Sequence, residues 1–290
     1  MAEAAITGRR DRDAVVVKAI ADRAQLRTFL ERDRLFGAYA LCDLEDREFA
    51  KTRWAAAWAN DELTAVVLEH AGLSPQPLFV MGDNDGIERV LRDLIRPRAA
   101  YVAALPEQLP AVATQYRVEL GPPMVRMWVD RAHFQPYPGE VARLLPVEIG
   151  ELNSLYQLGF ASWLQPSAIN DGVYYGVRFG GRLVAAAGTH VISPQARLAV
   201  VGNVLTHTQY RGRGFATATT GAVTAELLRF CDQVVLNVRS DNPPALQAYR
   251  RLGYQEHVRF EERLVHRIAP VWPTFGPLRR LFGRRENPTP

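Results

Sequence analysis

The chain has 290 residues, about the length of two domains of ordinary size. Hydrophobic residues make up 48% of it and charged residues 23%, a balance that excludes a disordered chain, and the dispersed Gly and Pro exclude collagen-like repeats. No apolar run reaches the roughly 18 residues that span a bilayer, and charges stand near the start where a signal peptide needs an apolar core. We therefore expect a cytoplasmic protein without stable membrane association.

The net charge of +4 is spread along the chain. DNA-binding proteins gather basic residues on one face, so we expect no nucleic-acid partner. Cys42 and Cys231 lie far apart and the six His are scattered, which predicts two buried, reduced thiols and no metal site.

A leader over 1–20 precedes a first half over 21–135, whose elements follow from apolar periodicity. The predicted elements are a helix over 21–34, strands over 54–59, 62–69 and 77–81, a helix over 87–95, a strand over 100–104, a helix over 107–115 and a strand pair within 117–129. Asn60 and Asp61 are typical of a hairpin turn between the first two strands.

The proline-containing segment 133–140 places a boundary before a second half over 136–268. Its predicted elements are a helix over 147–158, strands over 173–178, 182–192 and 198–206, a helix over 215–230, a strand over 233–239, a helix over 243–252 and a strand over 257–265. Gly180 and Gly181 indicate a second hairpin. Because both halves repeat one order of elements, we expect a duplicated α/β fold with mixed sheets. The basic tail 269–290 is expected to be a loosely docked end rather than a membrane-surface helix.

One glycine-rich turn joins the predicted strand 198–206 to the predicted helix 215–230. It consists of Gln209, Tyr210, Arg211, Gly212, Arg213 and Gly214, and the helix opens with Phe215 and Ala216. Glycines let the backbone approach a ligand closely, and the free N–H groups of a first helical turn attract anions. The turn therefore predicts a pyrophosphate site. It is neither a Rossmann nor a P-loop motif, since the third Gly, the later acidic residue and the Lys-Ser/Thr pair are all missing.

A second motif follows, in which Asn242 precedes Ala245 at +3, Tyr249 at +7 and Gly253 at +11. Together the two motifs resemble the GNAT superfamily of acyl-CoA-dependent N-acyltransferases, most closely over 204–252. The sequence of residues 202–214 is similar to that of the C-terminal domain of glycine N-acyltransferase-like members. The resemblance covers about 145–267.

The resemblance implies a role for each matching residue. The turn from Gln209 to Ala216 would hold the CoA pyrophosphate. The backbone of Val204, Leu205 and Thr206 would bind the pantetheine arm and the acyl carbonyl, and Asn242 would bond to the pantetheine. Tyr249 would protonate the leaving thiolate. Two plain alternatives stay open: Asn242 before Pro243 is a good helix N-cap, and Tyr249 suits a packed core.

The first half carries Asp83 and Asp85 in the turn that should match the pyrophosphate site. Carboxylates repel a pyrophosphate, so we expect a degenerate first domain that does not bind CoA. We expect the second domain to be an N-acetyltransferase that transfers an acetyl or short acyl group to an amine by direct attack. A non-catalytic acyl-CoA-binding or sensing module is the alternative. A two-domain aminoacyl transferase is a third interpretation, although such enzymes normally lack an intact pyrophosphate turn.

The predicted strand 198–206 contains no carboxylate to act as a base. It offers Asn203, whose amide does not take a proton at neutral pH. Either the amine arrives neutral, or its proton leaves through water ordered by Asn203 and relayed to His190 or His207. The first route favours an α-amino or similarly weakly basic acceptor.

Overall fold

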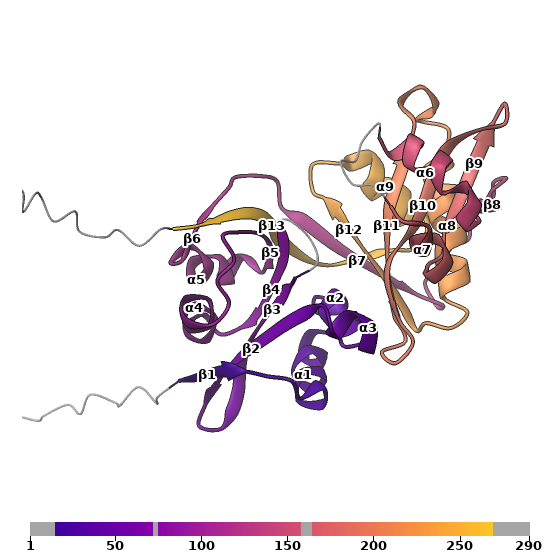
Figure 1. Cartoon of the computed structure of the whole chain (residues 1–290). Coiled ribbons are helices and arrows are strands. Elements are labelled where there is room, and N and C mark those ends of the chain that lie inside the picture. The colour runs from indigo at the N-terminus through magenta and orange to yellow at the C-terminus, as the bar shows by residue number, and fades with distance from the viewer. Residues whose placement is uncertain (1–14, 72–74, 158–163, 269–290) are drawn as a thin grey trace, which may run out of the picture.

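The computed structural model describes residues 15–71, 75–157 and 164–268. Within these ranges thirteen strands form one continuous sheet of parallel and antiparallel pairs, flanked by helices (Figure 1). The expected mixed α/β class is confirmed. No helix in the described ranges is long and apolar enough to cross a membrane. The tail 269–290 and most of the leader lie outside the described residues.

The first half carries its helices on both sides of an antiparallel run of strands that ends in one parallel pair, β4 with β5. In chain order its elements are β1 (Val16–Ala19), α1 (Arg23–Leu30), η1 (Glu31–Asp33), α2 (Ala38–Cys42), α3 (Asp46–Phe49), β2 (Thr52–Ala59), β3 (Glu62–His70), β4 (Gln76–Gly82), α4 (Asn84–Asp93), β5 (Ala99–Ala104), η2 (Pro106–Gln108), α5 (Leu109–Ala113), β6 (Tyr116–Val118) and β7 (Met124–Asp130).

The second half repeats this arrangement, with β9, β10 and β11 antiparallel and β11 parallel to β12. In chain order its elements are β8 (Ala142–Arg143), η3 (Pro146–Glu148), α6 (Ile149–Tyr156), α7 (Pro166–Asp171), β9 (Tyr175–Phe179), β10 (Arg182–Ser193), β11 (Leu198–Thr206), η4 (Thr208–Tyr210), α8 (Phe215–Leu227), β12 (Gln233–Arg239), α9 (Pro243–Arg251) and β13 (Gln255–Arg267).

Both predicted hairpins are confirmed by left-handed backbone at their turns. Asn60 and Asp61 have φ of 50° and 61°, and Gly180 and Gly181 have φ of 58° and 79°. Such values match the right-handed twist of the strands on either side. The helix expected over 87–95 begins earlier, at Asn84, because Asp83 caps it.

The two halves exchange strands. β13 pairs with β7 over Gln255–Phe260 and then with β5 and β6 over Glu261–Arg267. This strand joins two parts of the continuous sheet, which we call the first sheet (β1 to β6) and the second sheet (β7 to β12). β7, which precedes the predicted boundary, lies between β12 and β13 in the second sheet (Figure 1). The expectation that the strands within 117–129 pair with each other is therefore wrong. The boundary at 135/136 stays a prediction, but backbone hydrogen bonds cross it.

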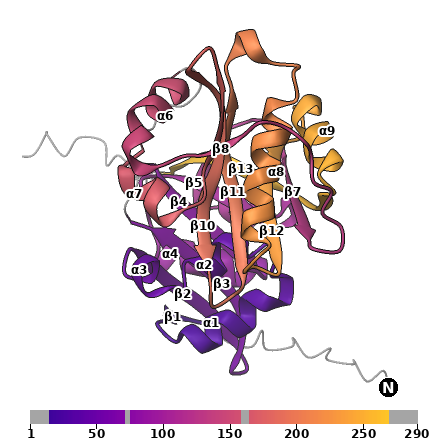
Figure 2. The same cartoon turned by 90° about the vertical axis from the view of Figure 1, so that its right-hand side faces the viewer.

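A shared hydrophobic core follows from this exchange. Phe36 and Leu41 of the first half pack in one cluster with Leu198, Val200 and Val235 of the second. Helix α2 lies against β10 and β11 and is seen at their lower ends in Figure 2. Both cysteines are buried and free, as expected. The first half thus covers one face of the second sheet.

This exchange predicts that the second half does not fold when it is cut at residue 136. Without β7, strands β12 and β13 lose the partner between them and expose unpaired edges. We expect a fragment 136–268 to aggregate and a fragment 122–268, which keeps β7, to be more soluble and more ordered. Circular dichroism and size-exclusion chromatography measure both. Equal, native-like behaviour of the two fragments would show that β7 is dispensable.

Candidate active site

Strands β11 and β12 run parallel and then part from each other. Their paired positions run from Leu198 opposite Gln233 to Val201 opposite Leu236, and no pair follows among the described residues. β11 continues as far as Thr206, so its last part presents backbone groups that β12 does not satisfy. An extended ligand with amide groups of its own can pair with this open edge.

A bulge lies in β11 where the two strands part. On its other side, β10 pairs Gly188 with Gly202 and Ala186 with Leu205, so β11 holds one residue more than β10 between these pairs. Asn203, inside the bulge, has a left-handed φ of 52°. Bulges of this kind redirect side chains next to functional sites.

The residues after the bulge face opposite layers of the domain. Val204 packs against the cluster that contains Tyr249, beside α8 and α9. Leu205 packs against the cluster that contains Tyr174, on the side of α6. Successive side chains at the end of β11 therefore alternate between the two layers that cover the sheet.

The glycine-rich turn leads directly into α8. Gly212 and Gly214 have φ of 76° and 78°, a region that other residue types enter only at a cost. Gln209 is exposed, and Phe215 and Ala216 of the first helical turn are half-buried. Gly214 at the N-cap gives no side chain to the free N–H groups of this turn. These groups and the helix dipole form an anion-binding end.

Two exposed arginines flank this helix end. The Arg213 guanidinium lies over the rings of Phe179 and Tyr210, 5.6 and 5.4 Å from their centres. Arg211 donates through Nε to the Thr206 carbonyl at 3.3 Å. These contacts hold both positive charges beside the turn.

Tyr137 also lies at the start of α8, which the composition of its segment did not indicate. A Cβ on Gly214 would stand 2.7 Å from the Tyr137 hydroxyl oxygen, and a Cβ on Gly139 would stand 2.7 Å from the Ala218 Cβ. The segment between β7 and β8 therefore passes over the first turns of α8. Its proline content predicted a linker but not where the linker lies.

Asn242 caps α9, as its plain alternative predicted. Its Oδ1 accepts a hydrogen bond from the Ala245 N–H at 3.4 Å, and Pro243 occupies the first helical position. The side chain is exposed, and its Nδ2 donates no hydrogen bond to another described residue. The capping role thus leaves a donor for a ligand.

Tyr249 is a residue of α9 that is 7% exposed and packs in the core cluster with Val223 and Leu227 of α8. Its ring centre lies 6.1 Å from that of Tyr254. Burial raises the pKa of the Tyr249 hydroxyl to about 12. The hydroxyl therefore keeps its proton at neutral pH, as a hydrogen donor must.

Asn203 and His190 are in direct contact, whereas His207 lies apart from them. The Asn203 Oδ1 is 3.2 Å from the His190 Nε2. The His207 Nδ1 instead accepts from the Gln209 N–H at 3.3 Å. The other His190 nitrogen, Nδ1, lies 2.6 Å from the hydroxyl of Tyr39, a residue of the first half that sequence analysis missed.

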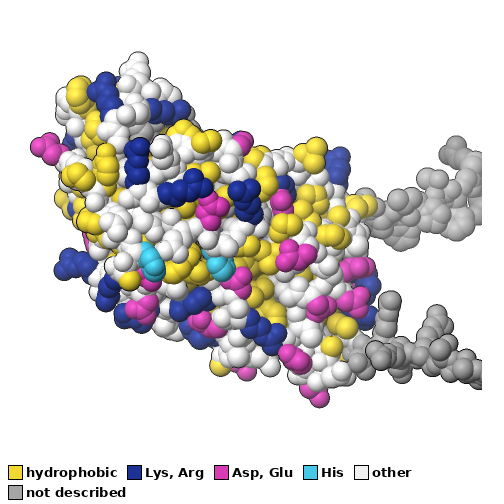
Figure 3. Space-filling model, turned by 180° about the vertical axis from the view of Figure 1, so that it is seen from behind, with side chains coloured by type: hydrophobic (Ala, Val, Ile, Leu, Met, Phe, Trp, Pro, Cys, Tyr) yellow, Lys and Arg dark blue, Asp and Glu magenta, His cyan; other side chains and the backbone are white. Residues whose placement is uncertain are grey.

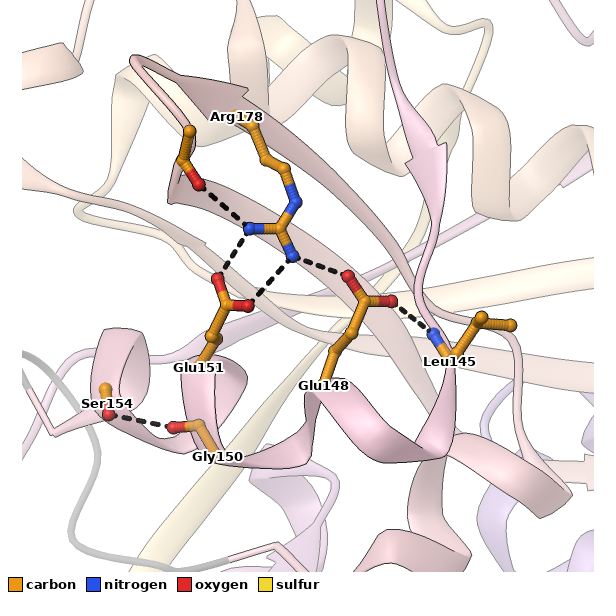
Figure 4. Close-up of polar contacts among 7 residues, drawn as sticks. Leu145, Glu148, Gly150, Glu151, Ser154 and Arg178 are labelled. Atoms are coloured by element: carbon orange, nitrogen blue, oxygen red, sulfur yellow. Dashed lines mark hydrogen bonds and ion pairs between the residues drawn. The ribbon is translucent and has the colours of Figure 1, made fainter.

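Arg178 of β9 fastens α6 to the sheet (Figure 4). Its guanidinium donates to the carboxylates of Glu148 and Glu151 and to the Gly181 carbonyl. A cavity of about 230 Å³ lies between α6 and the start of β10, and His207 lines it. The cavity opens on the face of the sheet that α6 covers.

In the first half, the N-terminus of α4 corresponds to that of α8, but side chains of the protein itself occupy it. β4 pairs with β5 only as far as Phe79, and α4 follows. Asp83 accepts a hydrogen bond from the Gly86 N–H at 2.8 Å, and Gln108 donates to the Gly82 carbonyl at 3.3 Å. A carboxylate of the chain itself thus occupies the place of an anion, and the Gln108 amide bridges the end of β4.

One group of side chains in the described ranges has ligand atoms close enough for a metal ion, within 4.8 Å of one another: Asp43, Glu48 and His70. Lys51 Nζ lies 2.7 and 2.8 Å from the two Glu48 oxygens, so an ammonium already neutralises this carboxylate. The group belongs to the first half. The expected absence of a metal stays a prediction.

Basic and acidic side chains are intermixed on the face seen in Figure 3. Many arginines stand in ion pairs with neighbouring carboxylates, as Arg197 does with Asp232 at 2.7 Å. The face in Figure 3 thus carries charges of both signs, and the expected absence of a nucleic-acid partner stays a prediction.

Comparison with known families agrees with this geometry. Residues 144–254 match the model of the acetyltransferase (GNAT) family. This range includes β11, the glycine-rich turn and α9. These residues are thus similar to a GNAT acetyltransferase domain. The similarity supports, in general terms, an enzyme that transfers an acyl group to an amine. No curated protein matches the chain.

Solved GNAT structures resemble most of the chain in fold. A GCN5-related N-acetyltransferase from Sphaerobacter thermophilus is 16% identical with a TM-score of 0.60, over 88% of this chain and 95% of that one. A tandem GNAT protein from the clavulanic acid biosynthesis pathway is 12% identical with a TM-score of 0.54, over 89% and 99%. A GCN5-related N-acetyltransferase from Kribbella flavida is 18% identical with a TM-score of 0.54, over 71% and 87%. These likenesses show the fold.

A negative charge introduced at position 212 tests whether the N-terminus of α8 binds an anion. A Cβ at this position meets no other atom, and Asn and Asp tolerate its left-handed φ about equally. Gly212→Asn and Gly212→Asp therefore differ mainly in one negative charge. We expect Asp to weaken CoA binding about tenfold or more relative to Asn, measured by isothermal titration calorimetry. Equal affinities would place the pyrophosphate elsewhere.

Proposed function

We propose that the chain is an N-acyltransferase that transfers an acetyl or short acyl group from acyl-CoA to an amine, using its second half. One observation carries the proposal. The unpaired end of β11 lies beside a helix N-terminus that no side chain caps, so a ligand with amides at one end and phosphates at the other fits both.

The CoA would lie along this edge. The N–H groups of the first turn of α8, with Arg211 and Arg213, would hold its pyrophosphate. The backbone of β11 from Val204 to Thr206 would pair with the pantetheine amides, as a neighbouring strand would. The free Nδ2 of Asn242 would donate to the pantetheine from the opposite side of the gap.

The reaction would be direct attack of the amine on the thioester. A backbone N–H near Leu205 would stabilise the negative charge that develops on the acyl oxygen, because a fixed donor costs no reorganisation. Tyr249 would then give its proton to the CoA thiolate as the carbon–sulfur bond breaks. The raised pKa of about 12 keeps this proton bound at neutral pH, and the tyrosinate that forms takes a proton back from solvent.

The amine would enter on the α6 side of β11, opposite Tyr249, where Asn203 stands in the bulge. No carboxylate is available on this strand. A weakly basic acceptor such as an α-amino group suits this site, because a larger share of it is neutral at pH 7 than of an alkyl amine.

Tyr249→Phe tests the acid. The ring stays, so folding and CoA affinity are expected to change little, while kcat falls by roughly ten- to a thousand-fold as the general acid is lost. Thiol release from acetyl-CoA with a panel of amines measures kcat, and Tyr101→Phe, an exposed tyrosine at 46%, is the matched control. Binding of CoA without amine-dependent thiol release in the wild-type protein would indicate a binding module instead. Unchanged kcat in Tyr249→Phe would make this residue a packing residue.

The pH profile tests both the acid and the acceptor. For an amine of pKa near 8, kcat/KM should rise as the amine loses its proton and then stay level to about pH 10. The required form of Tyr249 is the protonated one, which is lost only as the pH approaches its pKa of about 12. A falling limb near pH 8–9 would contradict this acid, and a preference for amines of pKa above 10 would contradict the acceptor class.

A further inference from the structure

A chain of hydrogen bonds runs from the first half into the bulge of β11. The Tyr39 hydroxyl lies 2.6 Å from the His190 Nδ1, and the His190 Nε2 lies 3.2 Å from the Asn203 Oδ1. The Asn203 Nδ2 donates to the Tyr174 oxygen at 2.9 Å, and the Tyr174 hydroxyl donates to the Thr189 carbonyl at 3.0 Å. The chain thus links an element of each half to the edge where CoA is proposed to bind.

The donor and acceptor of each hydrogen bond follow from the group at the end of the chain, the Thr189 carbonyl. The Thr189 carbonyl only accepts, so the single proton of Tyr174 points to it, and the Tyr174 oxygen accepts from the Asn203 amide nitrogen. The Asn203 oxygen therefore faces the His190 ring, and Nε2 must carry a hydrogen. In a neutral imidazole Nδ1 is then bare and accepts from Tyr39. Burial lowers the pKa of His190, which favours this neutral form.

Two glycines make room for this arrangement. Gly188 and Gly202 are cross-strand partners on β10 and β11. A Cβ on Gly188 would overlap the Tyr174 ring, and a Cβ on Gly202 would overlap the His190 ring. Both rings therefore lie flat on the strands next to the bulge. The His190 side chain is nevertheless exposed, so solvent reaches it.

Burial, more than the charged groups around it, keeps the Tyr39 hydroxyl neutral. The Arg126 guanidinium of β7 lies 5.4 Å from the Tyr39 ring centre. Burial raises the pKa of Tyr39 above its usual value, Arg126 lowers it, and Glu262 and Asp43 raise it. Tyr39 is therefore a neutral hydroxyl at neutral pH and not a tyrosinate.

We propose that Tyr39 and His190 together accept the proton that the attacking amine releases, so that the first half completes the acceptor site. This inference rests on the proposed N-acyltransferase function. As the carbon–nitrogen bond forms, the nitrogen–hydrogen bond of the amine breaks and its proton passes to the Tyr39 oxygen. The proton of Tyr39 passes at the same time to His190 Nδ1. His190 becomes an imidazolium that still donates from Nε2 to Asn203, and it later returns its proton to solvent.

The kinetic test uses Tyr39→Phe, His190→Gln and the double variant in the full chain, with Tyr101→Phe as the control. Acetyl-CoA and amines of pKa near 8, such as glycinamide, are the probes. We expect kcat to fall about ten- to a hundred-fold in each single variant, the range of lost base catalysis, with KM for acetyl-CoA nearly unchanged. The double variant should lose no more than His190→Gln, because the two residues act in series. Unchanged kcat in Tyr39→Phe, or losses that multiply in the double variant, would overturn the proposal.

A spectroscopic test does not depend on activity. In protein labelled with ¹⁵N-histidine, the His190 signals of the wild type should show hydrogen on Nε2 and a hydrogen-bonded, bare Nδ1. Tyr39→Phe should shift the Nδ1 signal toward that of a free nitrogen, while Tyr101→Phe should not. Hydrogen on Nδ1 in the wild type would overturn the proposed direction of transfer. If the wild type released no thiol with any amine, the N-acyltransferase function would fail and the proton role with it, whereas the ¹⁵N signals would still show whether the hydrogen bonds run as described.

Discussion

Strand β13 pairs first with β7 in the second sheet and then with β5 and β6 in the first, and this shared strand holds the molecule together. Because β7 comes from the first half, neither sheet is complete without residues from the other. The exchange fixes the first half against the open face of the second sheet, where α2 packs on β10 and β11. The first half is thereby kept beside the half proposed to be active, close enough for Tyr39 to contact His190.

The second constraint is local to β11. Pairing with β12 stops after Val201, and the bulge at Asn203 turns the strand where the pairing stops. The same bulge separates the two sides of the proposed reaction, with Val204 toward Tyr249 and Asn203 toward His190. In the first half, Gln108 and Asp83 satisfy the corresponding groups internally. The two halves share a fold, but the strand edge is open at β11 in the second half and closed at β4 in the first. A few polar side chains make this difference.

The sequence predicted what depends on neighbours along the chain. Alternation and turn residues located the long strands and both hairpins, and the glycine-rich turn stands before α8 as expected. Short elements such as α2 and α7 have too few residues for a periodic signal. The strand exchange was missed because apolar strands of similar composition do not encode their partners locally. Tyr39 and Tyr137 were missed for a related reason: each acquires its place only when a distant segment is folded against the site.

Amide hydrogen exchange with and without CoA tests the central claim, that one acyl-CoA binds along the open edge of the second half. The account predicts slower exchange over 202–217, which includes the end of β11, the glycine-rich turn and the first turn of α8. It predicts no change over 82–87, where Asp83 already caps the matching helix. Protection of 82–87, or none over 202–217, would contradict it.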